Sequence, residues 1–170
     1  IFSEIAEERK KVALAKLPFV ATHIKESLKQ ENKVVCFAHH HAVIQALLDE
    51  FSGVSVAHYG AIKEKERDAN IQSFQNNDSI RLLVAGIKTA VGYTATAANH
   101  CIFAQEDWEP TTITQAEDRL HRFGQRGFVF VQHLVLEKSL DALMMGKVIE
   151  KQELIDTVLD GKSETQTNFE

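Results

Sequence analysis

Two arginines and a glutamine recur at helical spacing in segment 108–125. Gln115, Arg119 and Arg122 are separated by four and three residues, which places them on one stripe of an α-helix. A guanidinium group is planar and always charged, so two of them on one stripe are suited to binding phosphate oxygens. The spacing therefore indicates a phosphate-binding surface. The alternative is a solvated helix face on which Asp118 pairs with Arg122.

The residues around this stripe predict where the helix begins and ends. Pro110 suits the first turn of a helix, and Gly124 suits the position just past its end. The threonines after Pro110 are candidate N-caps, and Thr112 has capping-box spacing to Gln115. A second stripe of the same helix is apolar and is expected to face the core. It comprises Ala116, Leu120 and Phe123.

The run 115–125 reads Gln-Ala-Glu-Asp-Arg-Leu-His-Arg-Phe-Gly-Gln. It resembles motif VI of the superfamily-two helicase-like ATPases, in the form typical of the Swi/Snf-related DNA translocases, and Trp108-x-Pro110 precedes it at the expected distance. The resemblance implies that Arg119 and Arg122 are arginine fingers, which reach the γ-phosphate of ATP held by another lobe. It also implies that Gln115 fixes the arginine-bearing helix or the attacking water.

Length, charge and cysteine usage limit the classes of protein that fit. The 170 residues, 44% of them hydrophobic, suffice for one domain with its own core. A net charge of −5 gives no long-range attraction to nucleic acid, so any DNA contact must be a local patch. No apolar run approaches membrane-spanning length. Cys36 and Cys101 lie in apolar runs typical of buried strands, which indicates reduced thiols in an intracellular protein, in the cytoplasm or nucleoid of a prokaryote or in a nucleus.

Short apolar runs alternate with amphipathic segments, as in proteins built on a parallel sheet. Pro18 is expected to break or bend the first helix. With right-handed crossovers, the pattern predicts the α/β class: a RecA-like three-layer sandwich with a mainly parallel sheet and with N- and C-terminal helices packed on it. The expected strands are 33–38, 54–58, 80–85, 100–104 and 128–135. The expected helices outside the motif VI segment are 3–30, 42–51, 63–74 and 139–159.

We expect residues 1–160 to form a helicase C-terminal lobe, the second RecA-like lobe, in which 1–30 is a helical lead-in. Residues 161–170 are polar and are expected to be a disordered tail. The chain contains no Gly-x-x-x-x-Gly-Lys-Ser/Thr run, and no Asp-Glu pair follows a strand to hold Mg²⁺. By the resemblance, ATP and Mg²⁺ are held mainly by a missing first lobe, and the isolated chain is expected to be inactive.

Segment 86–98 is rich in small residues, which let a backbone approach a ligand closely. It resembles motif V of the same family, although it is one residue shorter and has Ala90 where glycine is more usual. By this resemblance Gly92 lies near the nucleotide and Lys88 can touch DNA phosphates. The alternative is a tight loop packed under the sheet.

Three consecutive histidines, 39–41, follow the first expected strand. Adjacent side chains do not converge on one ion, so we expect no metal site. The carboxyl end of a parallel strand is a usual ligand position, and this place is motif IV in the resembled family, near the DNA backbone. His39 and His40 are therefore candidates for DNA contact. Trp108 is the aromatic residue expected to meet the DNA groove, with a core tryptophan under the motif VI helix as the alternative.

The sequence thus predicts the second lobe of an ATP-dependent double-stranded DNA translocase or remodeller. Its expected partners are double-stranded DNA and the ATP-binding first lobe of the same parent protein. The runs Val-Val-Cys-Phe-Ala-His-His and Ala-Glu-Asp-Arg favour the annealing-helicase branch. One alternative is a non-enzymatic α/β module that uses the same basic helix to bind a protein. Another is a nucleotide-sugar transferase lobe, but no carboxylate-rich sugar site stands beside the motif VI segment.

Overall fold

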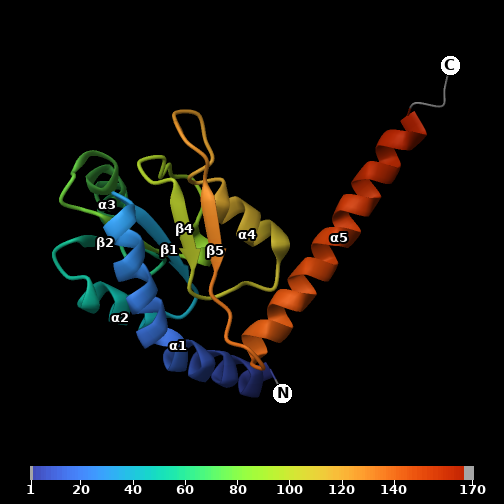
Figure 1. Cartoon of the computed structure of the whole chain (residues 1–170), viewed down its shortest axis with the longest axis horizontal. Helices are drawn as coiled ribbons and strands as arrows, with labels where there is room; N and C mark the ends of the chain where they lie inside the picture. Colours follow the sequence, from blue (N-terminus) through green and yellow to red (C-terminus); the bar gives the residue numbers. More distant parts are fainter. Residues whose placement is uncertain (1, 167–170) are drawn as a thin grey trace.

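The computed structural model describes the backbone of residues 2–166 and the side chains of residues 3–159. A five-stranded sheet organises the fold, in the order β2-β3-β1-β4-β5, and every neighbouring pair is parallel (Figure 1). This sheet confirms the predicted α/β class. The strands are β1 (Val34–Ala38), β2 (Ser55–His58), β3 (Leu82–Gly86), β4 (His100–Phe103) and β5 (Phe130–His133).

The central strands β1, β3 and β4 are buried along their whole length. Parallel strands covered by helices on both faces need apolar side chains at successive positions, which explains the continuous runs that the sequence contains. Cys36 and Cys101 lie in these strands as buried free thiols, as predicted, and burial raises the pKa of both. β5 is an edge strand and is shorter than predicted. Phe128 lies before it, almost fully exposed.

Helices cover both faces of the sheet and complete the predicted three-layer sandwich. Side chains alternate along β1, so that Val34 and Cys36 pack with helices α1 and α2, while Val35 and Phe37 pack with helices α3 and α4. A short 3₁₀ turn, η1 (Ile87–Thr89), follows β3. The helices that cover the sheet are α1 (Phe2–Gln30), α2 (His41–Glu50), α3 (Glu64–Asn76) and α4 (Pro110–Glu117).

α1 continues through Pro18 without interruption, and Figure 1 shows that it changes direction along its length. A proline lacks an amide hydrogen and removes one backbone bond of the helix, so a bend rather than a break is expected when the rest of the helix is packed. Ile24 of the second half is fully buried against the sheet. α1 therefore remains one element that covers a sheet face.

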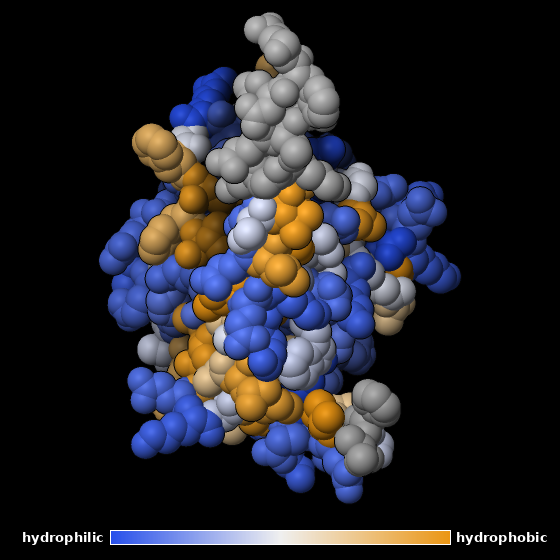
Figure 2. Space-filling view, turned by 90° about the vertical axis from the view of Figure 1, so that its right-hand side faces the viewer, coloured by the Kyte–Doolittle hydropathy of each residue, from blue (hydrophilic) through white to orange (hydrophobic). Residues whose placement is uncertain are grey.

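The last helix, α5 (Leu140–Gln166), packs on the rest of the described structure only over its first part. Met144 and Val148 are buried there, whereas Leu154 and Val158 farther along are exposed, and Figure 1 shows the helix projecting away from the sheet. Figure 2 shows apolar side chains at the surface on this side of the molecule. The prediction that the C-terminal helix packs on the sheet thus holds only for its beginning.

α5 also runs past the end predicted at residue 159. The segment 161–170, predicted to be disordered, is helical as far as Gln166, and residues 167–170 lie outside the described residues. Within the described part of the chain, no helix is both long and apolar enough to cross a membrane.

A buried ion pair joins the two terminal helices. Lys16 of α1 pairs with Asp141 in the first turn of α5, and both side chains are more than nine-tenths buried. The same ammonium group donates a hydrogen bond to the backbone carbonyl of Leu134, which follows β5. α1, the sheet edge and the start of α5 are therefore fixed to one another.

Candidate functional site

The arginine-bearing segment begins as a helix and continues as turns. α4 starts with Pro110 in its first turn, as predicted, but no threonine caps it: the N-cap residue is Glu109, whose side chain makes no capping bond. The helix ends at Glu117 rather than close to Gly124. Arg119 and Arg122 consequently lie beyond the helix, and the single helical stripe predicted for them is wrong.

A side chain explains why α4 ends where it does. Nε of Arg119 donates a hydrogen bond of 3.0 Å to the carbonyl oxygen of Gln115, the acceptor that the Arg119 amide would use in a continuing helix. The amide bonds instead to the carbonyl of Ala116, one residue nearer, at 3.1 Å. Because the helix stops there, only part of the predicted apolar stripe is buried. Leu120 is fully buried, whereas Phe123 is fully exposed.

The two guanidinium groups nevertheless converge on one place. Nη1 of Arg119 lies 3.3 Å and Nη1 of Arg122 lies 3.2 Å from the backbone carbonyl oxygen of Tyr93, and Nη1 of Arg122 also donates to Oγ1 of Thr94 at 3.2 Å. The amide of Ala95 donates to the carbonyl of Arg119 at 2.8 Å, which joins the two segments through their backbones. Tertiary contacts, and not helix periodicity, bring the arginines together.

Both arginines bond to neutral oxygens among the described residues. A carbonyl oxygen carries a partial charge only, and each guanidinium has five N–H donors, most of which stay free for another acceptor. Among the described residues neither Arg119 nor Arg122 forms an ion pair, so the predicted alternative of an Asp118–Arg122 pair is not observed. The arrangement can therefore accept an anion.

Two other predicted site residues lie beside the arginines. Gln115 is an exposed residue of α4 that contributes its backbone carbonyl to Arg119. Gly92 precedes Tyr93, is exposed and has φ of 78°, a conformation that side-chain-bearing residues rarely adopt. A Cβ atom at Gly92 would meet nothing within 4 Å, so the backbone conformation, not crowding, requires glycine here.

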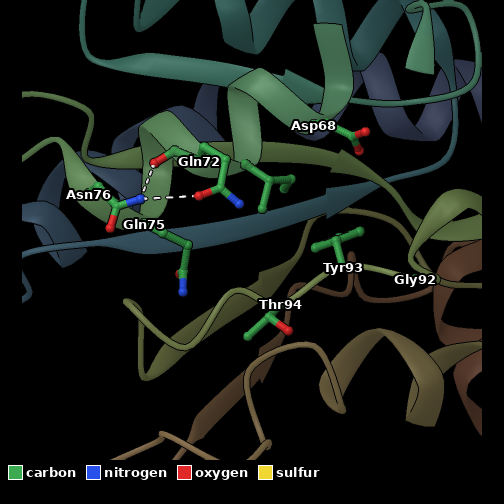
Figure 3. Close-up of a pocket in the computed structure, with 8 residues that line it drawn as sticks. Asp68, Gln72, Gln75, Asn76, Gly92, Tyr93 and Thr94 are labelled. Atoms are coloured by element: carbon green, nitrogen blue, oxygen red, sulfur yellow. Dashed lines mark hydrogen bonds between the residues drawn. The ribbon is translucent and has the colours of Figure 1, made fainter. Parts of the chain in front are cut away.

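A polar hollow of about 500 Å³ opens next to this segment, between α3 and residues 92–94 (Figure 3). Asp68 and Gln72 of α3 line one side, with further amide side chains along the same helix. The ring of Tyr93 is buried against His58, with ring centroids 4.2 Å apart, and burial raises the pKa of its hydroxyl, which is therefore neutral. The arginines thus bond to two residues, Tyr93 and Thr94, that line a hollow made mainly of neutral polar groups.

A second, smaller hollow of about 130 Å³ lies where β1, β2 and β3 end. His39 and Lys88 both line it, so the structure brings these two predicted DNA-contact residues together. Burial, together with the charges of Arg9, His40 and Lys88, lowers the pKa of His39 to about 4, so its ring is neutral at physiological pH. Lys88 is exposed in η1 and supplies a positive charge at this edge.

The structure gives His40 a different environment. Its Nδ1 lies 2.6 Å from Nε2 of Gln105, whose Oε1 accepts the backbone amides of His39 and His40 at 3.0 and 2.9 Å. Gln105 therefore holds the turn after β1 in place. Sequence reasoning missed this buried glutamine, because nothing in its local pattern shows that it will meet a turn 65 residues away.

Trp108 lies between the two terminal helices. Its ring is partly buried with the Arg9 guanidinium 6.0 Å from the ring centroid, and its carbonyl accepts a hydrogen bond of 2.9 Å from Lys151 of α5. The ring is therefore less buried than the core tryptophan of the alternative prediction, and the expected contact with the DNA groove stays a prediction. Across the part of the chain that the structure describes, no three His, Cys, Asp or Glu side chains are grouped so that they could hold a metal ion.

Residues 15–124, more than half of the chain, match the family model described as the helicase conserved C-terminal domain. The chain belongs to this helicase C-terminal family. Two relatives are similar over most of the chain: it is 34% identical over 160 residues to the human "DNA annealing helicase and endonuclease ZRANB3", and 32% identical over 153 residues to a Drosophila melanogaster "SWI/SNF-related matrix-associated actin-dependent regulator of chromatin subfamily A-like protein 1". It is the C-terminal RecA-like lobe of a Swi/Snf-family protein.

These two alignments cover 91% and 87% of the lobe, but only 15% and 20% of the relatives, so the lobe spans a fifth or less of their length. A solved structure supports the fold. The "C-terminal part of Fun30 ATPase domain" superposes on it with a TM-score of 0.67 at 23% identity, over 75% of this chain and 44% of that one.

Proposed function

We propose that this lobe is the second half of an ATP-dependent double-stranded DNA translocase or remodeller, and that Arg119 and Arg122 act as its arginine fingers. The observation that carries the proposal is the convergence of two guanidinium groups on the Tyr93 carbonyl, with no ion pair to a described residue. Planar donors of this kind match the oxygens of a phosphate group, whereas a neutral carbonyl satisfies them only in part.

The chemistry assigned to the arginines is stabilisation of negative charge. During phosphoryl transfer, charge spreads over the oxygens of the transferred group, and an arginine placed there is worth roughly three to five orders of magnitude in rate in analogous enzymes. Gln115 orients Arg119 through its carbonyl, and Gly92 keeps the neighbouring backbone open to a ligand. Mg²⁺, when bound, neutralises phosphate charge; we assign its ligands and the phosphate loop to the first lobe.

We assign DNA contact to the edge where β1 and β3 end. Lys88 supplies a charge for the DNA phosphates, and neutral His39 beside it can act as a hydrogen-bonding group. His40 supports this edge through Gln105, and Trp108 stands close to Arg9 at the boundary with the terminal helices. Because the chain is acidic overall, the contact is local.

We place the parent protein inside the cell, where DNA and ATP occur together. We also propose that it anneals DNA strands, the activity named for its human relative.

The loop between α4 and β5 is proposed to meet the first lobe. Phe123 and Phe128 in this loop are fully or almost fully exposed, which is unusual for large apolar side chains that stand near one another in the sequence. Gln125 fixes the loop, since its Nε2 donates to the carbonyls of Ala98 and Leu120 at 2.8 and 3.1 Å. A lobe that brings phosphate to Arg122 must pass beside Phe123. The same exposure would also suit the alternative, a non-enzymatic protein-binding module.

Separating and recombining the two lobes tests the proposal. The present chain and the ATP-binding lobe of its parent protein would be purified separately and mixed with double-stranded DNA. We expect neither lobe alone to hydrolyse ATP at a DNA-stimulated rate, and the mixture to do so. If the chain binds a protein partner with equal affinity with and without ATP, and the mixture stays inactive, the protein-binding module is correct instead.

A further inference from the structure

A buried carboxylate lies beneath the sheet edge and is not used by the function proposed above. Glu106 follows β4, and its side chain is completely buried. Its two carboxylate oxygens lie 3.0 and 3.1 Å from Nδ1 of His133, in the edge strand β5. A carboxylate that is removed from water needs a charged or hydrogen-bonding partner, and His133 provides it.

The opposite side of the same imidazole faces a second carboxylate. Nε2 of His133 lies 3.8 Å from Oε1 of Glu117, an ion-pair distance that is too long for a direct hydrogen bond. The ring of Phe103 stacks on the imidazole, with centroids 4.7 Å apart and planes 8° from parallel, and so fixes its orientation. Only the doubly protonated imidazolium offers an N–H to each carboxylate.

Glu117 connects this cluster to the arginine-bearing segment. It is the last residue of α4, and its backbone carbonyl accepts the amides of Leu120 and His121 in the turns that follow. Arg119 stands two residues beyond it. The position of Glu117 thus sets the direction in which the chain leaves α4 and carries Arg119 toward Tyr93.

We propose that His133, held between Glu106 and Glu117, is a positioning residue that fixes the start of the arginine-bearing segment against the edge of the sheet. The catalytic consequence rests on the function proposed above, while the bridging itself does not. The site consists of side chains from the loop after β4, the end of α4 and the edge strand β5.

The charges around the imidazole favour its protonated form. Burial by itself lowers the pKa of His133, but the hydrogen bond and charge of Glu106 and the charge of Glu117 outweigh it and raise the pKa above its ordinary value. Burial raises the pKa of Glu117, as do its neighbours Asp118 and Glu106, whereas His133 lowers it. Two further charged side chains bond to the backbone beside the cluster. Arg9 of α1 donates to the backbone carbonyl of Glu106. Lys16, which pairs with Asp141 of α5, donates to the backbone carbonyl of Leu134, the residue after His133.

The sign of the linkage to folding follows from this shift. Because the pKa of His133 is higher in the folded chain than in the unfolded chain, where it is about 6.5, protonated His133 stabilises the fold fully below that value. The contribution is lost as the pH rises through the folded-state pKa. The cluster is therefore intact below the ordinary pKa of a histidine and weakens as the pH rises through the higher folded-state pKa of His133.

The bridging is tested on the present chain by NMR titration of the His133 ring, assigned from the resonance that disappears in His133→Gln. We expect a pKa above the ordinary value, and a lower pKa in Glu117→Gln than in the wild type, because the charge of Glu117 helps to raise it. Glu109→Gln is the matched control, because Glu109 is a carboxylate of the same region that pairs with Lys151. A His133 pKa at or below the ordinary value, or one unmoved by Glu117→Gln, would overturn the bridging.

The positioning is tested on the parent protein with Glu117→Gln, which leaves no buried charge without its partner. We expect kcat for DNA-stimulated ATP hydrolysis to fall about tenfold, with KM for ATP and the melting temperature nearly unchanged. We also expect kcat of the wild type to decline as the pH rises through the measured pKa of His133, and Glu117→Gln to lose that dependence. An unchanged kcat and pH profile would show that the cluster only stabilises the fold.

The two proposals fail in different ways. If Arg119→Lys and Arg122→Lys both keep full turnover, the arginine-finger function is wrong, and the NMR titration still decides whether His133 bridges the two carboxylates. If the arginine variants are inactive and Glu117→Gln is fully active, the function stands and the positioning role is wrong.

Discussion

Replacing Arg122 by lysine in the parent protein distinguishes between a catalytic and a structural role of this residue. The substitution keeps a positive charge but removes the planar pair of donors. In the lobe, Arg122 is exposed and donates to two acceptors, the Tyr93 carbonyl and the Thr94 hydroxyl, both at 3.2 Å. A catalytic role and a structural role predict losses of very different size.

The structural loss is small. A net hydrogen bond contributes about 0.5–1.5 kcal/mol, and the lysine ammonium can replace one of the two bonds, so the free energy of unfolding should fall by no more than about 1 kcal/mol. In a domain of this size that lowers the melting temperature by about 2–4 °C. The catalytic loss is larger: if the guanidinium grips the transition state, turnover should fall at least about a hundredfold, equivalent to about 2.7 kcal/mol of barrier.

The assay is steady-state ATP hydrolysis with saturating double-stranded DNA, with a melting curve on the same preparation. KM for ATP should change little, because most of the affinity is assigned to the first lobe. Arg126→Lys is the matched control, because Arg126 is an exposed arginine of the same loop. Its contact with Gln125 is made by the backbone amide, which donates to Oε1 at 3.0 Å and which the substitution keeps. Turnover within about threefold of wild type in Arg122→Lys would remove Arg122 from the active site.

Three further outcomes are expected. The isolated chain should show no DNA-stimulated ATP hydrolysis, which a contaminant-free turnover assay checks; measurable turnover would contradict the two-lobe proposal. Its binding to DNA should be weak and should fall a further severalfold in Lys88→Ala, as measured by fluorescence anisotropy at fixed salt. His39→Gln should leave the change in binding between pH 7 and pH 6 unaltered, because the pKa of His39 is about 4; a change that His39→Gln abolishes would show that the His39 ring becomes charged. Asp141→Asn should destabilise the fold by about 3–5 kcal/mol in urea unfolding, because it leaves the buried Lys16 charge without its partner, and a loss below about 1 kcal/mol would show that water reaches this pair.

The sequence by itself determined the sheet and the family. The apolar runs at β1, β3 and β4 have one stable use, as strands covered on both faces, because a half-exposed strand would alternate polar and apolar residues. Pro110 fixed the start of α4 for a local reason, its preset backbone angle. The motif VI spacing also indicated Arg119 and Arg122, because a motif is recognised from residue types and intervals, which do not depend on how the segment folds.

Tertiary structure decided how those residues are presented. The end of α4 depends on whether Arg119 folds back onto the Gln115 carbonyl, and local propensity does not distinguish that bond from one more helical turn. The meeting of both guanidiniums at Tyr93 requires residues 26 and 29 positions apart to become neighbours, and it exposes Phe123, which helix periodicity assigned to the core. His133 and Glu106 come together because β5 pairs with β4 at the sheet edge. Such contacts depend on which strands are adjacent in the sheet, and the local sequence pattern of a strand does not determine which strand lies beside it.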